Sequence, residues 1–367
     1  MKEGWTIRTI GEVALHLCDG SHNPPVGIDF SEYPMLSSKN IFFDSYDYSE
    51  PRYLTKEQFD IENKRTNVSD GDILLTIVGT IGRVCCIKEP FQPFTLQRSV
   101  AVIKPNKNII ISRYLMYCLC GLNAYFNKEA KGVAQKGIYL KQLSKISIPV
   151  PPLQEQERIV AELDLLTEII DKQKQQLKEL DTLAKSIFYD MFGNPNINDM
   201  KWDYSTFKSI FKFKSGDGLI GKNFMQGNYP VYGGNGISGY HNKYNKDGDY
   251  IIVGRVGAYC GNVRYVKGQF WLTDNAFQAL FDNTVLDYVF VCYLLNAINL
   301  HQYANQAAQP VISNVVLKDI QIIMPPKAIQ REFAKKIQTI ESQKQSINRS
   351  IAESQKLFDY TMDKYFG

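Results

Sequence analysis

The sequence predicts an α+β protein in which two β-rich, mixed α/β domains are joined by two long antiparallel coiled-coil helices. Three observations predict this fold: an internal repeat, two long segments without Gly or Pro, and short β-type runs separated by dense turn signals. Because one unit is used twice, the repeat also predicts a pseudo-two-fold relation between the halves.

The internal repeat is most visible around two proline pairs. Residues 143–152 recur as residues 317–326, 174 positions later, and the same offset maps Gln156 onto Gln330. Upstream landmarks recur at other offsets, because Trp5 corresponds to Trp202 at 197 positions and residues 70–72 to residues 247–249 at 177. The first domain therefore carries 20 additional residues between Trp5 and residue 70.

A long helix is predicted after each proline pair, at about 153–192 and 327–366. Apolar residues alternate there in steps of four and three, which is the heptad pattern of coiled-coil packing. The seam positions coincide at the 174-residue offset, and those expected to carry the helix pairing and partner binding are Ile159, Leu163, Leu166, Leu177, Leu180, Phe333, Ile337, Ile340, Ile351 and Phe358. We expect the polar seam residues Gln173, Lys344 and Ser354 to fix the register.

These patterns divide the chain into four segments. Residues 1–152 and 194–326 are the expected domains, and residues 153–193 and 327–367 the expected helices. The first helical segment carries 5 Lys/Arg against 9 Asp/Glu and the second 8 against 5, which favours packing of the two helices on each other.

Within the domains, β-type runs at 73–78, 100–103 and 250–253 predict strands. Segments 112–126 and 287–302 are expected to form short helices. β-structure should therefore dominate both domains.

Composition indicates a cytoplasmic globular protein. Hydrophobic residues make up 44% and charged residues 22%, no apolar run approaches the ~20 residues of a membrane span, and the first residues lack a signal-peptide pattern. The net charge of +4 permits a local basic groove without requiring one. Seven cysteines without a Cys-x-x-Cys pair and four scattered histidines argue against a metal site, so we expect small buried thiols.

Two motifs suggest a cofactor or catalysis but stand in the wrong context. Residues 216–221 match G-x-G-x-x-G, yet the glycines and proline that follow cannot form the helix that a nucleotide loop requires. Residues 23–26 resemble the Asn-Pro-Pro-aromatic loop of amino-methyltransferases, but Val26 cannot stack on a base. The sequence contains no catalytic residues in a recognisable context, which favours a binding protein.

Polar and aromatic loops, together with arginines beside β-type runs, are the candidate DNA contacts. Arg and Lys pair with guanine, and Asn and Gln with adenine. The candidates are Ser21, His22, Asn23, Arg83, Gln97, Arg98, Asn235, Tyr240, His241, Lys243, Arg255 and Arg264.

The ordered set of features resembles the specificity subunit of type I restriction–modification systems. The resemblance covers essentially the whole chain and rests on the twice-used order of domain and helix, on residues 151–156, and on the loops at 19–22, 229–236 and 254–258. The second helix departs from the pattern, since only Gln330 matches after its prolines.

The resemblance implies a subunit without a catalytic centre and without a bound cofactor or metal. Each domain would read one half of a split, asymmetric double-stranded DNA sequence. The helix pair would space the domains and dock two methyltransferase subunits, which use S-adenosylmethionine to methylate adenine N6. An ATP-dependent restriction and translocase subunit, with its Mg²⁺, would join the complex for cleavage.

Two alternatives stay open at the level of sequence. The chain could be a stand-alone DNA adenine methyltransferase that uses the two motifs above, or a coiled-coil scaffold with no DNA role. Binding of S-adenosylmethionine by the purified chain would identify the first. Retention on duplex DNA at moderate salt, compared with high salt, tests the second.

Overall fold

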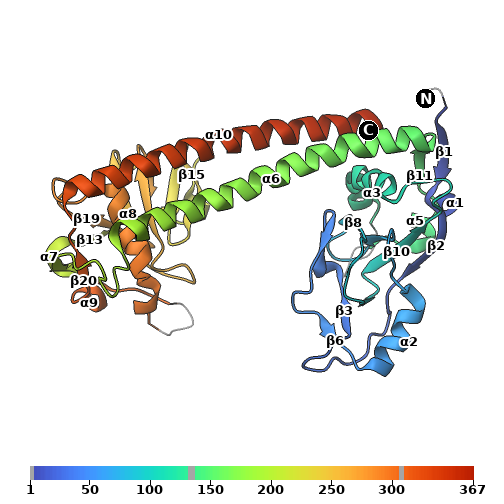
Figure 1. Cartoon of the computed structure of the whole chain (residues 1–367), viewed down its shortest axis with the longest axis horizontal. Helices are drawn as coiled ribbons and strands as arrows, with labels where there is room; N and C mark the ends of the chain where they lie inside the picture. Colours follow the sequence, from blue (N-terminus) through green and yellow to red (C-terminus); the bar gives the residue numbers. More distant parts are fainter. Residues whose placement is uncertain (1–3, 131–136, 306–309) are drawn as a thin grey trace. The chain divides into compact units, whose positions relative to one another are not determined.

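The structure is a computed structural model that describes residues 4–130, 137–305 and 310–367, and these form two compact units (Figure 1). Unit 1 comprises Met1–Lys172 with Ile351–Gly367, and unit 2 comprises Gln173–Ser350. Each unit therefore contains one β-rich domain and a part of both long helices. The repeat of Ala134-Gln135 as Ala308-Gln309 lies outside the described residues.

The same four-stranded antiparallel sheet is built once in each unit. The strand order is β2-β10-β7-β8 in unit 1 and β13-β19-β16-β17 in unit 2. The bounds are β2 Ala14–Asp19, β10 Val100–Pro105, β7 Ile73–Thr76, β8 Val84–Cys86, β13 Lys212–Ser215, β19 Ala276–Leu280, β16 Asp249–Gly254 and β17 Val263–Lys267. The three predicted β-type runs overlap β7, β10 and β16, which confirms the strands, although β7 ends at Thr76, two residues before the predicted end.

Two smaller sheets are repeated as well. In β6-β3-β9 and in β15-β14-β18 the central strand pairs antiparallel on one side and parallel on the other. The pairs β1-β11 and β12-β20 close each domain next to its long helix. The bounds are β6 Arg52–Tyr53, β3 Pro34–Leu36, β9 Thr95–Leu96, β15 Gly236–His241, β14 Tyr229–Gly233, β18 Trp271–Leu272, β1 Thr6–Thr9, β11 Ser147–Val150, β12 Tyr204–Thr206 and β20 Gln321–Ile323.

Short helices follow the same repeat, with one addition in unit 1. The corresponding pairs are α1 Ile10–Val13 with α7 Phe207–Ile210, α3 Ser112–Gly121 with α8 Tyr288–Ile298, and α5 Leu140–Leu143 with α9 Asn314–Leu317. The remaining short elements are α4 Asn123–Glu129 and the 3-10 turns Ser38–Asn40, Gly221–Asn223 and Leu300–Tyr303. Within the described residues, helix α2 (Lys56–Thr66) and the hairpin of β4 (Ile41–Phe42) and β5 (Ser45–Tyr46) have no counterpart in unit 2, and they lie in the segment expected to carry the additional residues.

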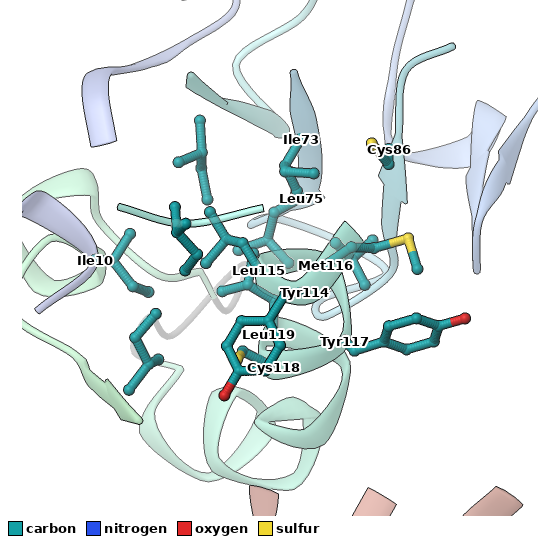
Figure 2. Close-up of a cluster of buried hydrophobic side chains, with 14 of the residues drawn as sticks. Ile10, Ile73, Leu75, Cys86, Tyr114, Leu115, Met116, Tyr117, Cys118 and Leu119 are labelled. Carbon is teal, nitrogen blue, oxygen red and sulfur yellow. The ribbon is translucent and has the colours of Figure 1, made fainter. Parts of the chain in front are cut away.

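The core of unit 1 lies between its sheet and helix α3 (Figure 2). Ile73 and Leu75 from β7 and Tyr114 and Leu115 from α3 are fully buried. Met362 near the end of the second long helix joins the same cluster. Burial of these apolar side chains is the main stabilising contribution, and it ties residues distant in sequence to one domain.

The two predicted long helices are α6 (Leu153–Phe192) and α10 (Lys327–Phe366). In unit 1 the start of α6 meets the end of α10, because the Arg158 guanidinium donates to the Tyr365 hydroxyl at 2.9 Å. In unit 2 the later part of α6 meets the earlier part of α10, because the Lys344 ammonium lies 2.8 Å from Asp181. The pairing is antiparallel and coiled-coil-like, as expected.

The predicted seam positions lie on the less exposed face of the two helices. Every seam residue named above is buried or half-buried, and Gln173 donates to the Ser350 hydroxyl at 2.7 Å. None of residues 171–183 or 341–357 is fully buried, and the seam positions there are half-buried. The apolar packing is therefore concentrated where the helices contact the domains.

A buried glutamine opens each long helix in the same way. The amide of Gln156 donates to the carbonyls of Pro151 and Ile109 and accepts from the backbone N–H of Ile111 at 2.8 Å. Gln330 makes the corresponding three bonds to Pro325, Val285 and Asp287. Because both side chains are fully buried, each glutamine satisfies backbone groups that would otherwise be unpaired.

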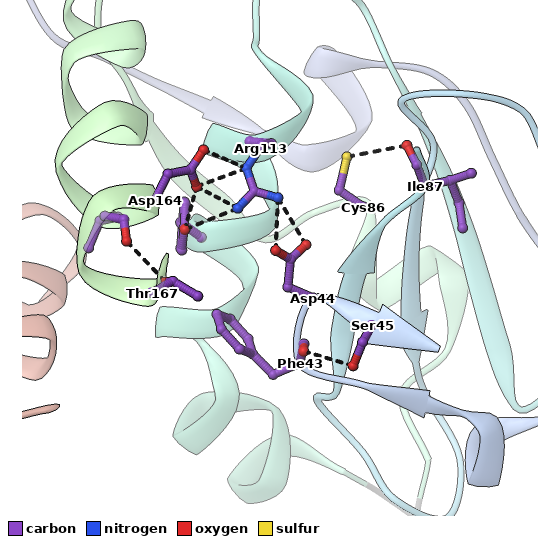
Figure 3. A network of polar contacts seen from close by, with 10 residues as sticks. Phe43, Asp44, Ser45, Cys86, Ile87, Arg113, Asp164 and Thr167 are labelled. Carbon is purple, nitrogen blue, oxygen red and sulfur yellow. Dashed lines mark hydrogen bonds and ion pairs between the residues drawn. The ribbon is translucent and has the colours of Figure 1, made fainter. Parts of the chain in front are cut away.

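Different contacts add to the apolar packing of the long helices on the two domains. In unit 1, Arg113 of α3 forms bidentate ion pairs with Asp44 and with Asp164 of α6 (Figure 3). In unit 2, Phe192 of α6 packs against Phe290 of α8 at 4.7 Å and against Phe333 of α10 at 5.3 Å between ring centroids.

Candidate nucleic-acid interface

A close backbone crossing fixes the loop that leaves the first sheet strand of each domain. A Cβ atom at Gly20 would lie 2.1 Å from the carbonyl oxygen of Leu96, and one at Gly216 would lie 2.2 Å from that of Leu272. These distances exclude any side chain, so glycine is required at both positions. The same crossing occurs in both units, so the two loops correspond, and Ser21 of unit 1 is equivalent to Asp217 of unit 2.

In unit 1 this crossing brings four predicted residues together. The Ser21 N–H donates to the Leu96 carbonyl at 2.7 Å, and its carbonyl accepts from Arg98 at 2.9 Å, which places the loop beside Gln97. The Ser21 side chain is buried, whereas His22 and Arg98 are exposed and Gln97 is half-buried. His22, Gln97 and Arg98 therefore form one polar surface, and Ser21 supports it from below.

An open depression of about 480 Å³ lies next to this surface. Lys39, Arg52 and Gln97 line it, and the Arg52 guanidinium donates to the carbonyls of Pro24 and Pro25. Asn23 is exposed at the start of this loop and Val26 is 87% exposed. Sequence reasoning missed Lys39 and Arg52, since neither stands in a motif.

Arg83 is attached to a different part of unit 1. Its guanidinium donates to the carbonyl of Ile41 at 3.3 Å and lies 5.2 Å from the centroid of the Phe42 ring. These contacts hold Arg83 against strand β4, and the side chain is half-buried.

In unit 2, two of the predicted residues contact each other. The Arg264 guanidinium donates to the carbonyl of Asn235 at 3.4 Å, and both residues are exposed. Arg255 is half-buried, stacks over Phe277 at 5.3 Å, and its buried Nε has no hydrogen-bond partner among the described residues. Asn235 and Arg264 thus form a polar surface, while Arg255 lies partly beneath the domain surface.

Three further predicted residues lie near the end of strand β15, and they differ in exposure. Tyr240 is 55% exposed, and Lys243 is exposed as well. His241 is only 4% exposed, its Nδ1 accepts from the backbone N–H of Met225 at 3.0 Å, and its ring packs against Trp271. The structure therefore places the His241 side chain in the domain interior.

The predicted seam residues are covered by the helix partner and the domains. Ile159, Leu163 and Phe333 are fully buried, and Ile337 and Phe358 nearly so. These five side chains are covered while the helices are paired, whereas Leu177, Leu180 and Ile351 are half-buried. Leu183 of α6 and Leu357 of α10, by contrast, are 47% and 52% exposed and correspond at the 174-residue offset.

The G-x-G-x-x-G motif at residues 216–221 does not lead into a long helix. After Gly216 the chain makes only the three-residue turn Gly221–Asn223, so there is no helix N-terminus for a phosphate. Among the described residues, no group of three metal-ligating side chains occurs and no helix is long and apolar enough to cross a membrane.

The cysteines are free, as expected, and five of the seven are buried. Burial raises the pKa of the Cys86, Cys120 and Cys292 thiols to about 11, so these side chains stay protonated at neutral pH.

The chain is similar to known proteins over nearly its whole length. A family model for the type I restriction modification DNA specificity domain matches residues 2–182 and again residues 200–354. The EcoprrI specificity subunit of Escherichia coli is 25% identical over 72% of this chain and 69% of its own length. The MjaVIII specificity subunit of Methanocaldococcus jannaschii is 22% identical over 93% of this chain and 87% of its own length.

A solved structure shares the fold. The S subunit of the type I restriction–modification system from M. genitalium aligns with a TM-score of 0.60 and 17% identity, covering 99% of this chain and 96% of that one.

The chain belongs to the type I restriction–modification DNA specificity family. Specificity subunits supply DNA sequence specificity and are not the catalytic subunits of these systems. The stand-alone methyltransferase and the scaffold without a DNA role are not supported.

Proposed function

We propose that this chain reads a split, asymmetric duplex target, with residues 1–152 reading one half and residues 194–326 the other. One observation carries the proposal: the same strand order and the same glycine crossing are built twice but present different side chains. At the corresponding positions unit 1 has His22 and Arg98, and unit 2 has Gly218 and Asp274. A common scaffold with different surface groups suits the recognition of two different base sequences.

The exposed polar residues are the proposed DNA contacts. Arg98 and Arg264 offer paired donors for guanine or phosphate, and Gln97 and Asn235 offer the donor–acceptor pair that matches adenine. Lys243 and Tyr240 suit phosphate contacts. Ser21 and His241 take supporting roles inside the domains, since their side chains are buried.

The outer face of the helix pair is the proposed docking surface for two methyltransferase subunits. Glu179 and Leu183 recur as Glu353 and Leu357 at the 174-residue offset, and all four are exposed. An exposed pair that occurs twice suits two copies of the same partner. S-adenosylmethionine would be held by those partners, and ATP and Mg²⁺ by a restriction and translocase subunit, in the cytoplasm where the DNA is.

Co-expression with methyltransferase subunits tests the proposed function directly. Sequencing of methylated adenines should report a split motif, and Arg98→Ala and Arg264→Ala should each relax one half of it by roughly 1–3 kcal/mol per lost base contact. Lys208→Ala, an exposed lysine on α7, is the control. A motif that needs no second half, or no motif at all, contradicts the proposal.

The docking surface has its own test. Leu183→Glu and Leu357→Glu should each remove one of two methyltransferase copies, because a charge replaces an apolar contact. Native mass spectrometry of the purified complex measures the copy number. Ile61→Glu on α2, where the wild-type side chain is 65% exposed, should leave both copies bound. Retention of two copies by both leucine variants would place docking elsewhere.

A further inference from the structure

A nearly buried carboxylate links two cationic or polar side chains at the reading loop of unit 1. Asp19, the last residue of β2, has a side chain that is 10% exposed. The guanidinium of Arg65, from helix α2, donates to the Asp19 carbonyl at 2.7 Å and also forms an ion pair with its carboxylate. The second carboxylate oxygen lies 2.8 Å from Nε2 of His22.

This contact sets which nitrogen of the His22 ring carries the hydrogen when the ring is neutral. A carboxylate only accepts hydrogen bonds, so Nε2 of His22 must carry the hydrogen. In the neutral ring Nδ1 is then an acceptor, and among the described residues it has no hydrogen-bond partner. The His22 side chain is 54% exposed, so an outside group can reach this nitrogen.

The arrangement does more than compensate a buried charge. Arg65 alone already pairs with the Asp19 carboxylate. His22 adds little burial, yet its ring is oriented by Asp19 and its backbone by the crossing at Gly20. A ring that is held in place while exposed to solvent loses little entropy when it binds, which is the usual design of a recognition group.

We propose that His22 reads a base of the unit 1 half-site, with Asp19 and Arg65 as positioning residues that present Nδ1 as a hydrogen-bond acceptor. The matching chemical group is the exocyclic amino group of adenine or cytosine in the major groove. This inference rests on the proposed DNA-reading function. Unit 2 lacks the arrangement, because Ser215 and Gly218 stand at the corresponding positions, so the effect is confined to one half-site.

The test uses the full chain co-expressed with its methyltransferase subunits and reads out the methylated motif. His22→Ala should relax one base position of one half-site, with discrimination lowered on the order of 10- to 100-fold, and leave the other half-site unchanged. His16→Ala is the matched control, because His16 is an exposed histidine on the same strand β2. It should leave both half-sites unchanged.

The positioning residues are tested by the base position that they affect. Asp19→Ala should relax the same position as His22→Ala, and the double variant should relax it no further, because both changes remove one contact. Asp19→Asn keeps an accepting oxygen and should recover part of the discrimination. A purely structural role would lower methylation at all sites without changing the preferred base.

The outcomes separate this inference from the function on which it rests. If the wild-type chain yields a split motif but His22→Ala keeps every base preference, or lowers methylation uniformly, the inference about His22 is wrong and the proposed function stands. If the wild-type chain yields no split motif with active partners, the proposed function itself fails.

Discussion

Units 1 and 2 share one topology and both pack apolar side chains against the long helices, but they add different contacts to that packing. Arg113 on α3 corresponds to Val289 on α8. Gln156 accepts from the backbone N–H of Ile111, and Gln330 accepts from that of Asp287, so the residues two places later correspond as well. Unit 1 adds the ion network of Arg113 to its apolar helix–domain packing, whereas unit 2 adds the ring cluster of Phe192, Phe290 and Phe333. The comparison shows that strand order and helix register are independent of the side chains that fill the helix–domain interface.

The largest effect is expected from breaking the ring cluster of unit 2. Phe192→Ala should destabilise unit 2 by about 3–5 kcal/mol, because it leaves a cavity among fully buried rings. Hydrogen exchange resolved by peptide should show loss of protection in residues 210–300 and little change in residues 70–120. Phe192→Leu, which fills most of the volume, is the control. Equal loss in both regions would contradict separate attachment.

The next effect concerns the ion network of unit 1. Arg113→Met leaves the carboxylates of Asp44 and Asp164 without their cation, so a loss of roughly 3 kcal/mol is expected in unit 1. Replacing all three charged residues by apolar ones should recover much of that loss. Peptide-resolved hydrogen exchange reports which unit changes. A single variant as stable as the wild type would show that the network contributes nothing to attachment.

A smaller loss of stability, equal in the two units, is expected from replacing the buried glutamine that opens each long helix. Gln156→Leu and Gln330→Leu should each cost about 1–3 kcal/mol, because each leaves buried backbone groups unpaired. Urea unfolding of the two variants, side by side, measures the difference between them. A difference above about 1 kcal/mol would mean that the two helix starts are not equivalent.

The smallest effect lies on the seam. Lys344 of α10 corresponds to the buried Ile170 of α6, and it forms ion pairs with Asp181 and Glu341. Lys344→Ile should change stability by no more than about 1 kcal/mol, because both carboxylates are largely exposed. Thermal unfolding at low and high salt should show a weaker salt dependence in the variant; an unchanged dependence would argue against these ion pairs.

Sequence reasoning predicted the repeated scaffold because its signals are local and periodic. The heptad pattern predicted both long helices, with seam positions that coincide at the 174-residue offset. The β-type runs predicted the strands that the structure has at 73–76 and 100–105. The repeat also predicted that Gln156 and Gln330 correspond, although their identical bonding needed the structure.

The site was less accessible to sequence reasoning, because burial depends on residues far apart in the chain. His241 belongs to a loop rich in polar and aromatic residues, yet Met225 and Trp271 enclose it. Arg65 lies 46 positions from Asp19, and no local pattern connects the two. The contacts that orient the candidate reading groups are therefore long-range, and only the fold reveals them.

The division of the chain between the units has a consequence for synthesis on the ribosome. Unit 2 is one continuous segment, Gln173–Ser350, whereas unit 1 needs Phe358, Met362 and Tyr365 to complete its core. Domains made first usually fold first. Here residues 4–172 emerge early but wait for residues 351–367, so unit 2 can finish folding before unit 1. A ribosome that stops near residue 350 would leave the earliest-made domain incomplete.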